Sequence, residues 1–115
     1  MKIENTKAQM RKGVLEFCIL SILKKGEAYP SEIIAQLKNS KMIVVEGTIY
    51  PLLTRLKNGE VLEYRWEESK SGPPRKYYSL SKKGEELLVG LEETWNELVQ
   101  AVKLTTKKNT KNEKD

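Results

Sequence analysis

Two short segments of this 115-residue chain carry side chains that suit the binding of a polyanion. In the first, residues 46–58, polar, aromatic and cationic residues share one side of a predicted helix: Gly47, Thr48, Tyr50, Pro51, Thr54 and Arg55. No acidic residue follows Glu46 there. Hydroxyl and guanidinium groups without carboxylates favour contact with an anionic groove. The plainer interpretation is that these residues only face water.

The second segment is the turn-rich stretch 69–74 together with the two residues after it. Gly72 and two prolines make a stiff, narrow tip, and Arg75 and Lys76 place two positive charges directly behind it. Such a tip can reach a minor groove or backbone phosphates with little loss of chain entropy. An ordinary hairpin connection is the alternative.

The composition offers few of the residue types that catalysis commonly uses. The chain has no histidine and one cysteine, which removes the commonest general base, a disulfide framework and a zinc site. No nucleophile elbow, phosphate loop or carboxylate pair is visible either. We therefore predict a binding protein rather than an enzyme, with no metal and no cofactor. Cys18 is expected to be a buried apolar residue beside Phe17.

The layout of charge is more informative than the formal net charge of +5. Segments 1–25, 63–83 and 101–115 carry net charges of +4, +3 and +3, whereas 84–97 carries −5. Clustered positive charge indicates a polyanionic partner, most often nucleic acid. No apolar run of about 18 residues exists, so no membrane span is expected and a cytoplasmic location is the default.

Apolar spacing predicts three successive helices in the first half of the chain. They cover residues 10–23, residues 30–37 and residues 46–58, and Pro30 suits a first helical turn. Pro51 falls inside the third helix and crowds the carbonyl of Gly47. Either the missing side chain of Gly47 gives that backbone room, or the helix begins only at Tyr50.

Over residues 62–66, apolar residues recur at every second position. Leu62, Tyr64 and Trp66 alternate with charged residues, which predicts a half-buried strand, and residues 75–80 return as a second strand. Ser81 is expected to cap a long final helix that ends at Thr105 or Thr106.

Three helices followed by a two-stranded ribbon is the order of a winged helix-turn-helix. We therefore predict a mainly α fold with a small two-stranded β wing and a long C-terminal dimerisation helix. The corresponding divisions are a domain at 1–80 that includes the N-terminal helix, the dimerisation helix at 81–106, and a tail at 107–115 without apolar residues that is expected to be disordered.

The final helix carries an apolar stripe that favours self-association. Its members are spaced three and four apart as in a coiled coil: Leu88, Leu91, Trp95, Leu98, Val102 and Thr105. Fewer than three heptads make a weak isolated coiled coil, so the first helix is expected to pack against this one across a dimer interface. The hypothesis is a two-fold homodimer on a pseudo-palindromic operator.

Three segments of the chain resemble a known family. The segments Glu46-Gly47-Thr48-Ile49-Tyr50-Pro51-Leu52-Leu53-Thr54-Arg55-Leu56, Tyr64-Arg65-Trp66-Glu67 and Gly72-Pro73-Pro74-Arg75-Lys76-Tyr77-Tyr78 look like the PadR family of bacterial transcriptional regulators. The resemblance implies a homodimeric winged-helix protein that binds double-stranded DNA, often as a ligand-responsive repressor. It also implies that Thr48, Tyr50, Pro51 and Arg55 lie on the DNA-facing helix, and that Gly72, Arg75 and Lys76 lie in a wing that touches DNA.

Two positions depart from the family pattern. Val45 stands where a small capping residue is usual before the glutamate, and it cannot accept the first free N–H groups of the helix. Ser31 stands where the pattern has a tyrosine, so no role of that tyrosine is carried over.

Trp95 has two interpretations. In some relatives a tryptophan on this helix lines a central dimer cavity and stacks on flat aromatic effectors, for which Phe17 and Leu91 are candidate neighbours here. Simple packing of the dimer is the other. For the chain as a whole, the alternative to a DNA-binding regulator is a winged-helix module that binds a protein and no DNA.

Overall fold

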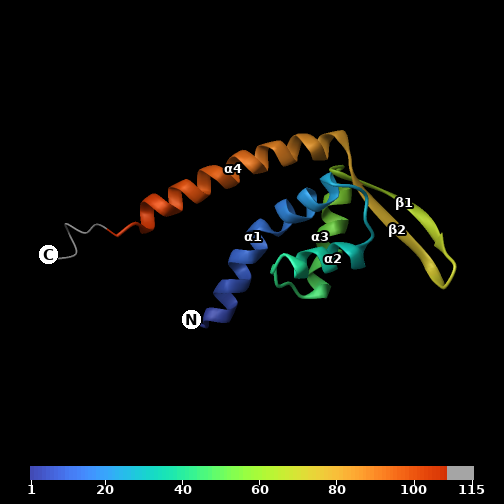
Figure 1. Cartoon of the computed structure of the whole chain (residues 1–115), viewed down its shortest axis with the longest axis horizontal. Coiled ribbons are helices and arrows are strands. Elements are labelled where there is room, and N and C mark those ends of the chain that lie inside the picture. Colours follow the sequence, from blue (N-terminus) through green and yellow to red (C-terminus); the bar gives the residue numbers. More distant parts are fainter. Residues whose placement is uncertain (109–115) are drawn as a thin grey trace.

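The computed structural model describes residues 1–108 and shows a helical bundle with one hairpin and one long helix projecting from it (Figure 1). Most of the predicted tail, residues 109–115, lies outside the described residues. The elements are α1 (Ile3–Lys24), α2 (Pro30–Asn39), α3 (Glu46–Asn58), β1 (Leu62–Ser69), β2 (Gly72–Leu80) and α4 (Lys82–Thr106). The mainly helical fold class with a two-stranded wing and a long C-terminal helix is thereby confirmed.

The core lies where the first three helices meet the base of the hairpin. Its most deeply buried side chains follow the apolar spacing of the helices: Leu15, Ile19, Leu20, Ile33, Leu37, Ile49, Leu53 and Leu62. From α4, Leu88 joins this core at 3% exposure, and Leu91 packs partly against it. The start of α4 is therefore part of the winged-helix body, while its later turns extend away from it (Figure 1).

Helix boundaries agree with the predicted ones to within two residues except at the start of α1. α1 begins at Ile3, seven residues before the predicted start at Met10. The prediction missed the first turns because they are exposed and carry no apolar periodicity. α3 begins at Glu46, so the alternative of a start at Tyr50 is wrong. Val45 supplies no side-chain cap there, and the backbone N–H of Thr48 donates instead to the carbonyl of Val45 at 2.8 Å.

The hydroxyl of Ser81 joins α4 to the loop before β1. The hydroxyl accepts a hydrogen bond from the backbone N–H of Gly84 at 3.0 Å and donates one to the carbonyl of Glu60 at 2.6 Å. Gly84 lies so close to the segment between α3 and β1 that an added Cβ would be 2.1 Å from the carbonyl oxygen of Val61. The cap and the close approach together fix where α4 leaves the body.

The hairpin is longer than predicted, and its turn is shorter. β2 begins at Gly72, so the two prolines of the predicted turn lie in the strand, and Lys70 and Ser71 form the tip. Prolines are tolerated here because a two-stranded ribbon consists of edge strands. The expectation that Arg75 and Lys76 stand directly behind the tip is wrong: they pair with Glu67 and Trp66, along the length of the ribbon.

The predicted half-burial of the first strand is also wrong. Leu62 is buried, but Tyr64 and Trp66 are 37% and 60% exposed. The hairpin projects beyond the helices, so no element covers this part of its surface (Figure 1). Tyr78, by contrast, is buried and exchanges two backbone hydrogen bonds of 3.0 and 2.8 Å with Ala28, which fasten the wing to the loop before α2.

Candidate nucleic-acid interface

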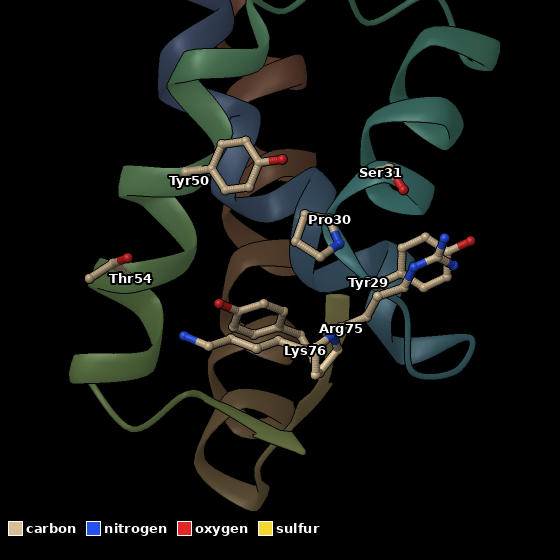
Figure 2. Close-up of a pocket in the computed structure, with 9 residues that line it drawn as sticks. Tyr29, Pro30, Ser31, Tyr50, Thr54, Arg75 and Lys76 are labelled. Atoms are coloured by element: carbon tan, nitrogen blue, oxygen red, sulfur yellow. The ribbon is translucent and has the colours of Figure 1, made fainter. Parts of the chain in front are cut away.

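A cleft of about 430 Å³ lies between the start of α2, the exposed side of α3 and strand β2 (Figure 2). It is lined by hydroxyls, cations and rings: Tyr29, Pro30, Ser31, Tyr50, Thr54, Pro74, Arg75, Lys76 and Tyr78. Residues from both segments singled out in the sequence thus face one cleft, although they belong to different elements.

The helix side of the cleft is built by the periodicity of α3. Ile49, Leu52, Leu53 and Leu56 are buried, which turns Tyr50 and Thr54 outward one helical turn apart. Both present hydroxyl groups that can donate and accept hydrogen bonds. Tyr50 is 47% exposed, so its ring is available to a ligand as large as a duplex.

The wing side of the cleft supplies positive charge. The guanidinium of Arg75 lies 4.4 Å from the ring centroid of Tyr29, and the ammonium of Lys76 lies 4.5 Å from that of Tyr64. Within residues 1–108, neither Arg75 nor Lys76 is ion-paired with a carboxylate. Their charges remain available to an anion, and the rings hold the long side chains in place.

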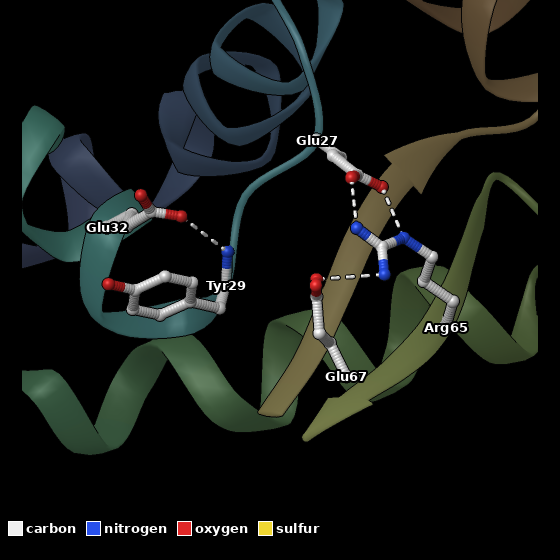
Figure 3. A network of polar contacts seen from close by, with 5 residues as sticks. All are labelled: Glu27, Tyr29, Glu32, Arg65 and Glu67. Atoms are coloured by element: carbon white, nitrogen blue, oxygen red, sulfur yellow. Dashed lines mark hydrogen bonds and ion pairs between the residues drawn. The ribbon is translucent and has the colours of Figure 1, made fainter. Parts of the chain in front are cut away.

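Arg65 is different, because it is already neutralised (Figure 3). Its Nε and Nη2 donate to the two carboxylate oxygens of Glu27 at 3.0 and 2.5 Å, and its Nη1 lies 2.9 Å from Oε2 of Glu67. These bonds lower the pKa of Glu27 and raise the pKa of Arg65. The triad joins the wing to the loop before α2. At the end of that loop the backbone N–H of Tyr29 donates a hydrogen bond of 3.1 Å to Glu32 in the first turn of α2.

The other residues predicted on α3 do not share the cleft with Tyr50 and Thr54. Thr48 borders a smaller hollow of about 200 Å³ formed with the first half of α1. Arg55 is ion-paired with Glu16 of α1. Pro51 is exposed on α3. The single face expected from the sequence is divided because residues of α1 lie beside Thr48 and Arg55.

On the wing, Gly72 is set apart from the cleft, since it pairs with Ser69 at the outer end of the hairpin. The cleft also includes five residues that were not predicted as DNA contacts: Tyr29, Pro30, Ser31, Pro74 and Tyr78. At the start of α2, the only signal in the sequence was the departure of Ser31 from the family pattern.

The final helix places its apolar stripe in two environments. Leu88 belongs to the chain's own core, so the expectation that it lies on an exposed dimer seam is wrong: the first turns of α4 pack on α1. Trp95, Leu98 and Val102 are 42%, 50% and 56% exposed. The rings of Phe17 and Trp95 lie 6.3 Å apart at 44°, which makes them neighbours within one chain.

Comparison with known proteins identifies the family of this chain. A model of the transcriptional regulator PadR-like family matches residues 19–89, more than half of the chain. The chain belongs to the PadR-like family. Its members are transcriptional regulators, which confirms the expectation that this PadR-like protein is not an enzyme. Within residues 1–108, no helix is long and apolar enough to cross a membrane.

Solved structures agree with this assignment. A PadR-like transcription factor from Bacteroides fragilis is 57% identical, with 89% of this chain and 99% of that chain covered and a TM-score of 0.74. A PadR-like regulator from Bacillus cereus is 37% identical, with coverage of 88% and 99% and a TM-score of 0.76. Bacillus subtilis PadR, solved in complex with operator DNA, is 26% identical over 68% of this chain and 46% of that chain, with a TM-score of 0.63.

Proposed function

We propose that this PadR-like protein is a sequence-specific regulator that binds double-stranded DNA through α3 and the wing. The observation that carries the proposal is the shared cleft, in which Tyr50 and Thr54 of α3 face Arg75 and Lys76 of β2. Hydroxyls beside unpaired cations suit base edges next to phosphates. The complex of Bacillus subtilis PadR with operator DNA supports the same partner for this chain.

Each side chain has a distinct part in the proposal. Tyr50 and Thr54 contact base edges in the major groove, and Arg75 and Lys76 contact phosphates. Pro51 and Gly72 are compact enough to let the protein backbone at these positions approach the duplex closely. Thr48 and Arg55 contact the sugar-phosphate backbone of the DNA on the side of α3 that is next to α1.

The proposed active form is a homodimer. Residues 1–80, together with the first turns of α4 that pack on them, form the DNA-binding domain. Helix 81–106 dimerises through the apolar side chains that its own chain leaves exposed, chiefly Trp95, Leu98 and Val102. A two-fold axis would present two copies of α3 to successive major grooves about 34 Å apart, which matches a pseudo-palindromic operator.

The proposed action is repression in the cytoplasm, relieved by a flat aromatic effector. Trp95 and Phe17 offer adjacent rings for stacking, with Leu91 beside them on α4. An effector that prefers a dimer geometry unsuited to the operator would lower DNA affinity by its differential binding, typically about 1–3 kcal/mol. Dimer packing by Trp95 without an effector is the competing interpretation.

The direct test is the affinity of the protein for a duplex taken from immediately upstream of its own gene. Arg75→Gln and Lys76→Gln should each weaken binding and reduce the salt slope by about one, and the double variant by about two. Unchanged affinity in all three variants would remove the wing from the interface. No binding by the wild-type protein would favour the protein-binding module.

A further inference from the structure

The aromatic residues of β1 that the core leaves uncovered lie together on one face of the wing. Tyr64 and Trp66 are paired across the ribbon with Tyr78 and Lys76. Directly paired residues project to the same side of a sheet, so these four side chains share a face. The rings of Tyr64 and Trp66 meet edge to face at 6.1 Å, and most of the Trp66 surface is open to solvent.

Two ammonium groups lie on these rings. Lys76 is 4.5 Å from the ring centroid of Tyr64 and 5.2 Å from that of Trp66, and Lys57 of α3 is 5.6 Å from Tyr64. Neither lysine has a carboxylate partner within residues 1–108. The face therefore combines an exposed flat apolar surface with positive charge that no side chain neutralises.

The opposite face of the same hairpin carries both compensated and uncompensated charge. There Arg65 is held between Glu27 and Glu67, and its charge is compensated within the chain. Arg75, which pairs across the ribbon with Glu67, also lies on that face and packs over the ring of Tyr29. On the aromatic face the two lysines lie beside the exposed indole, which favours a polyanion there, because an apolar protein surface would desolvate both ammonium groups without pairing them.

The aromatic face is continuous with the cleft of Figure 2. Lys76 and Pro74 line that cleft, and Pro74 also borders a shallow hollow of about 550 Å³ formed with Trp66, Pro73 and Glu68. A duplex backbone that leaves the cleft along the wing would therefore meet Trp66 next. Glu68 adds a carboxylate to this hollow, near the outer end of the ribbon.

We propose that Trp66 is a further DNA contact, positioned by Tyr64 and Lys76. The indole packs against the deoxyribose edge of a backbone strand while the ammonium of Lys76 meets a neighbouring phosphate. The inference rests on the proposed function and extends it, since it adds a nonionic contact to a wing whose other contacts are ionic. The two kinds of contact respond differently to salt.

The first test compares Trp66→Ala, Trp66→Phe and Lys76→Gln on the upstream duplex at several salt concentrations. Trp66→Ala should weaken binding about tenfold, because it removes a buried apolar contact, and its line of log Kd against log salt should stay parallel to the wild-type line. Trp66→Phe should keep most of the affinity. Lys76→Gln should reduce the slope by about one.

The second test measures the fluorescence of the Trp66 indole directly. In a Trp95→Phe background, whose own affinity serves as the reference, Trp66 is the remaining tryptophan. Its emission should change on titration with the upstream duplex and saturate at the same DNA concentration as binding measured by anisotropy. This readout does not require removal of Trp66, so it still decides the matter where Trp66→Ala unfolds the wing.

The outcomes separate the two proposals. Duplex binding by the wild type, with unchanged affinity in Trp66→Ala and unchanged emission of Trp66, overturns the role of Trp66 and leaves the proposed function intact. That result would fit a wing face used by a protein partner. No duplex binding by the wild type overturns the proposed function and the Trp66 contact together. Loss of affinity with parallel salt lines and a saturating emission change supports both.

Discussion

Arg55 of α3 is ion-paired with Glu16 of α1. The contact joins the helix that the proposal places on DNA to the helix that packs on α4. The residue after Glu16 is Phe17, whose ring is next to that of Trp95. Consecutive residues of α1 therefore contact the proposed DNA-binding helix and the exposed stripe of α4.

Replacement of Glu16 by glutamine should release Arg55 for phosphate binding. We expect tighter binding to any duplex, by a few-fold, because a phosphate no longer competes with Glu16 for the guanidinium of Arg55. Affinity measured at several salt concentrations checks this. Arg55→Gln should have the opposite effect, and the double variant should behave as Arg55→Gln alone. Independent, additive effects would show that the pair does not control Arg55.

Gly84→Ala should destabilise the protein by about 1–3 kcal/mol, because the added Cβ would meet the backbone carbonyl of Val61, which a side-chain rotation cannot relieve. Gly90→Ala in the same helix is the matched control, since nothing lies within 4 Å of its added Cβ. Helix propensity should make that variant about 1 kcal/mol more stable. Chemical denaturation of both measures the difference, and equal stability would contradict the close approach.

The Glu27–Arg65 pair should make stability depend on pH in the acid range. The pKa of Glu27 is lowered from its ordinary value of 4.5 by the hydrogen bonds from Arg65. A carboxyl group whose pKa is lowered in the folded state stabilises the fold at pH values above its unfolded-state pKa. This stability is lost as the pH falls below about 4.5. Thermal unfolding of Glu27→Gln should show a weaker loss of stability in acid than the wild type. Glu63→Gln, at another exposed glutamate, should follow the wild type.

Leu98→Glu and Val102→Glu should convert the proposed dimer into monomers. Each places a charge within the exposed apolar stripe of α4, where it would be desolvated in the interface. Light scattering at micromolar concentration measures the mass. Gln100→Glu lies on a different side of α4 and should remain dimeric. A monomeric wild type at that concentration would overturn the dimer.

Flat aromatic compounds should quench the emission of Trp95 if Trp95 lines an effector site. A Trp66→Phe background leaves Trp95 as the remaining tryptophan. Phe17→Ala should weaken the quenching, because it removes the neighbouring ring. No quenching and no thermal shift across a panel of such compounds would favour the packing interpretation.

Cys18 takes no part in these proposals. It is half-buried against the core, and desolvation raises the pKa of its thiol. A thiol that resists ionisation is a poor nucleophile and a poor redox sensor. The expectation of a buried residue is met only in part, since Cys18 packs against the core but keeps part of its surface exposed.

The helices and the cap at Ser81 could be predicted because they depend on local spacing. The buried positions of α3, its end at Gly59 and the proline that opens α2 are all written in residues close together along the chain. The environment of the hairpin could not be predicted in the same way. Alternation at Tyr64 and Trp66 indicates a strand, but whether a second layer covers it depends on elements elsewhere in the fold.

The sequence by itself determined the order of elements, the family resemblance, and the two segments rich in hydroxyls and cations. Only the tertiary structure decided which of those residues meet. It brought Tyr50 and Thr54 to Arg75 and Lys76, turned Thr48 and Arg55 toward α1, and placed Leu88 in the core. The physical reason is that periodicity defines the sides of each helix, whereas the neighbour on each side depends on long-range packing.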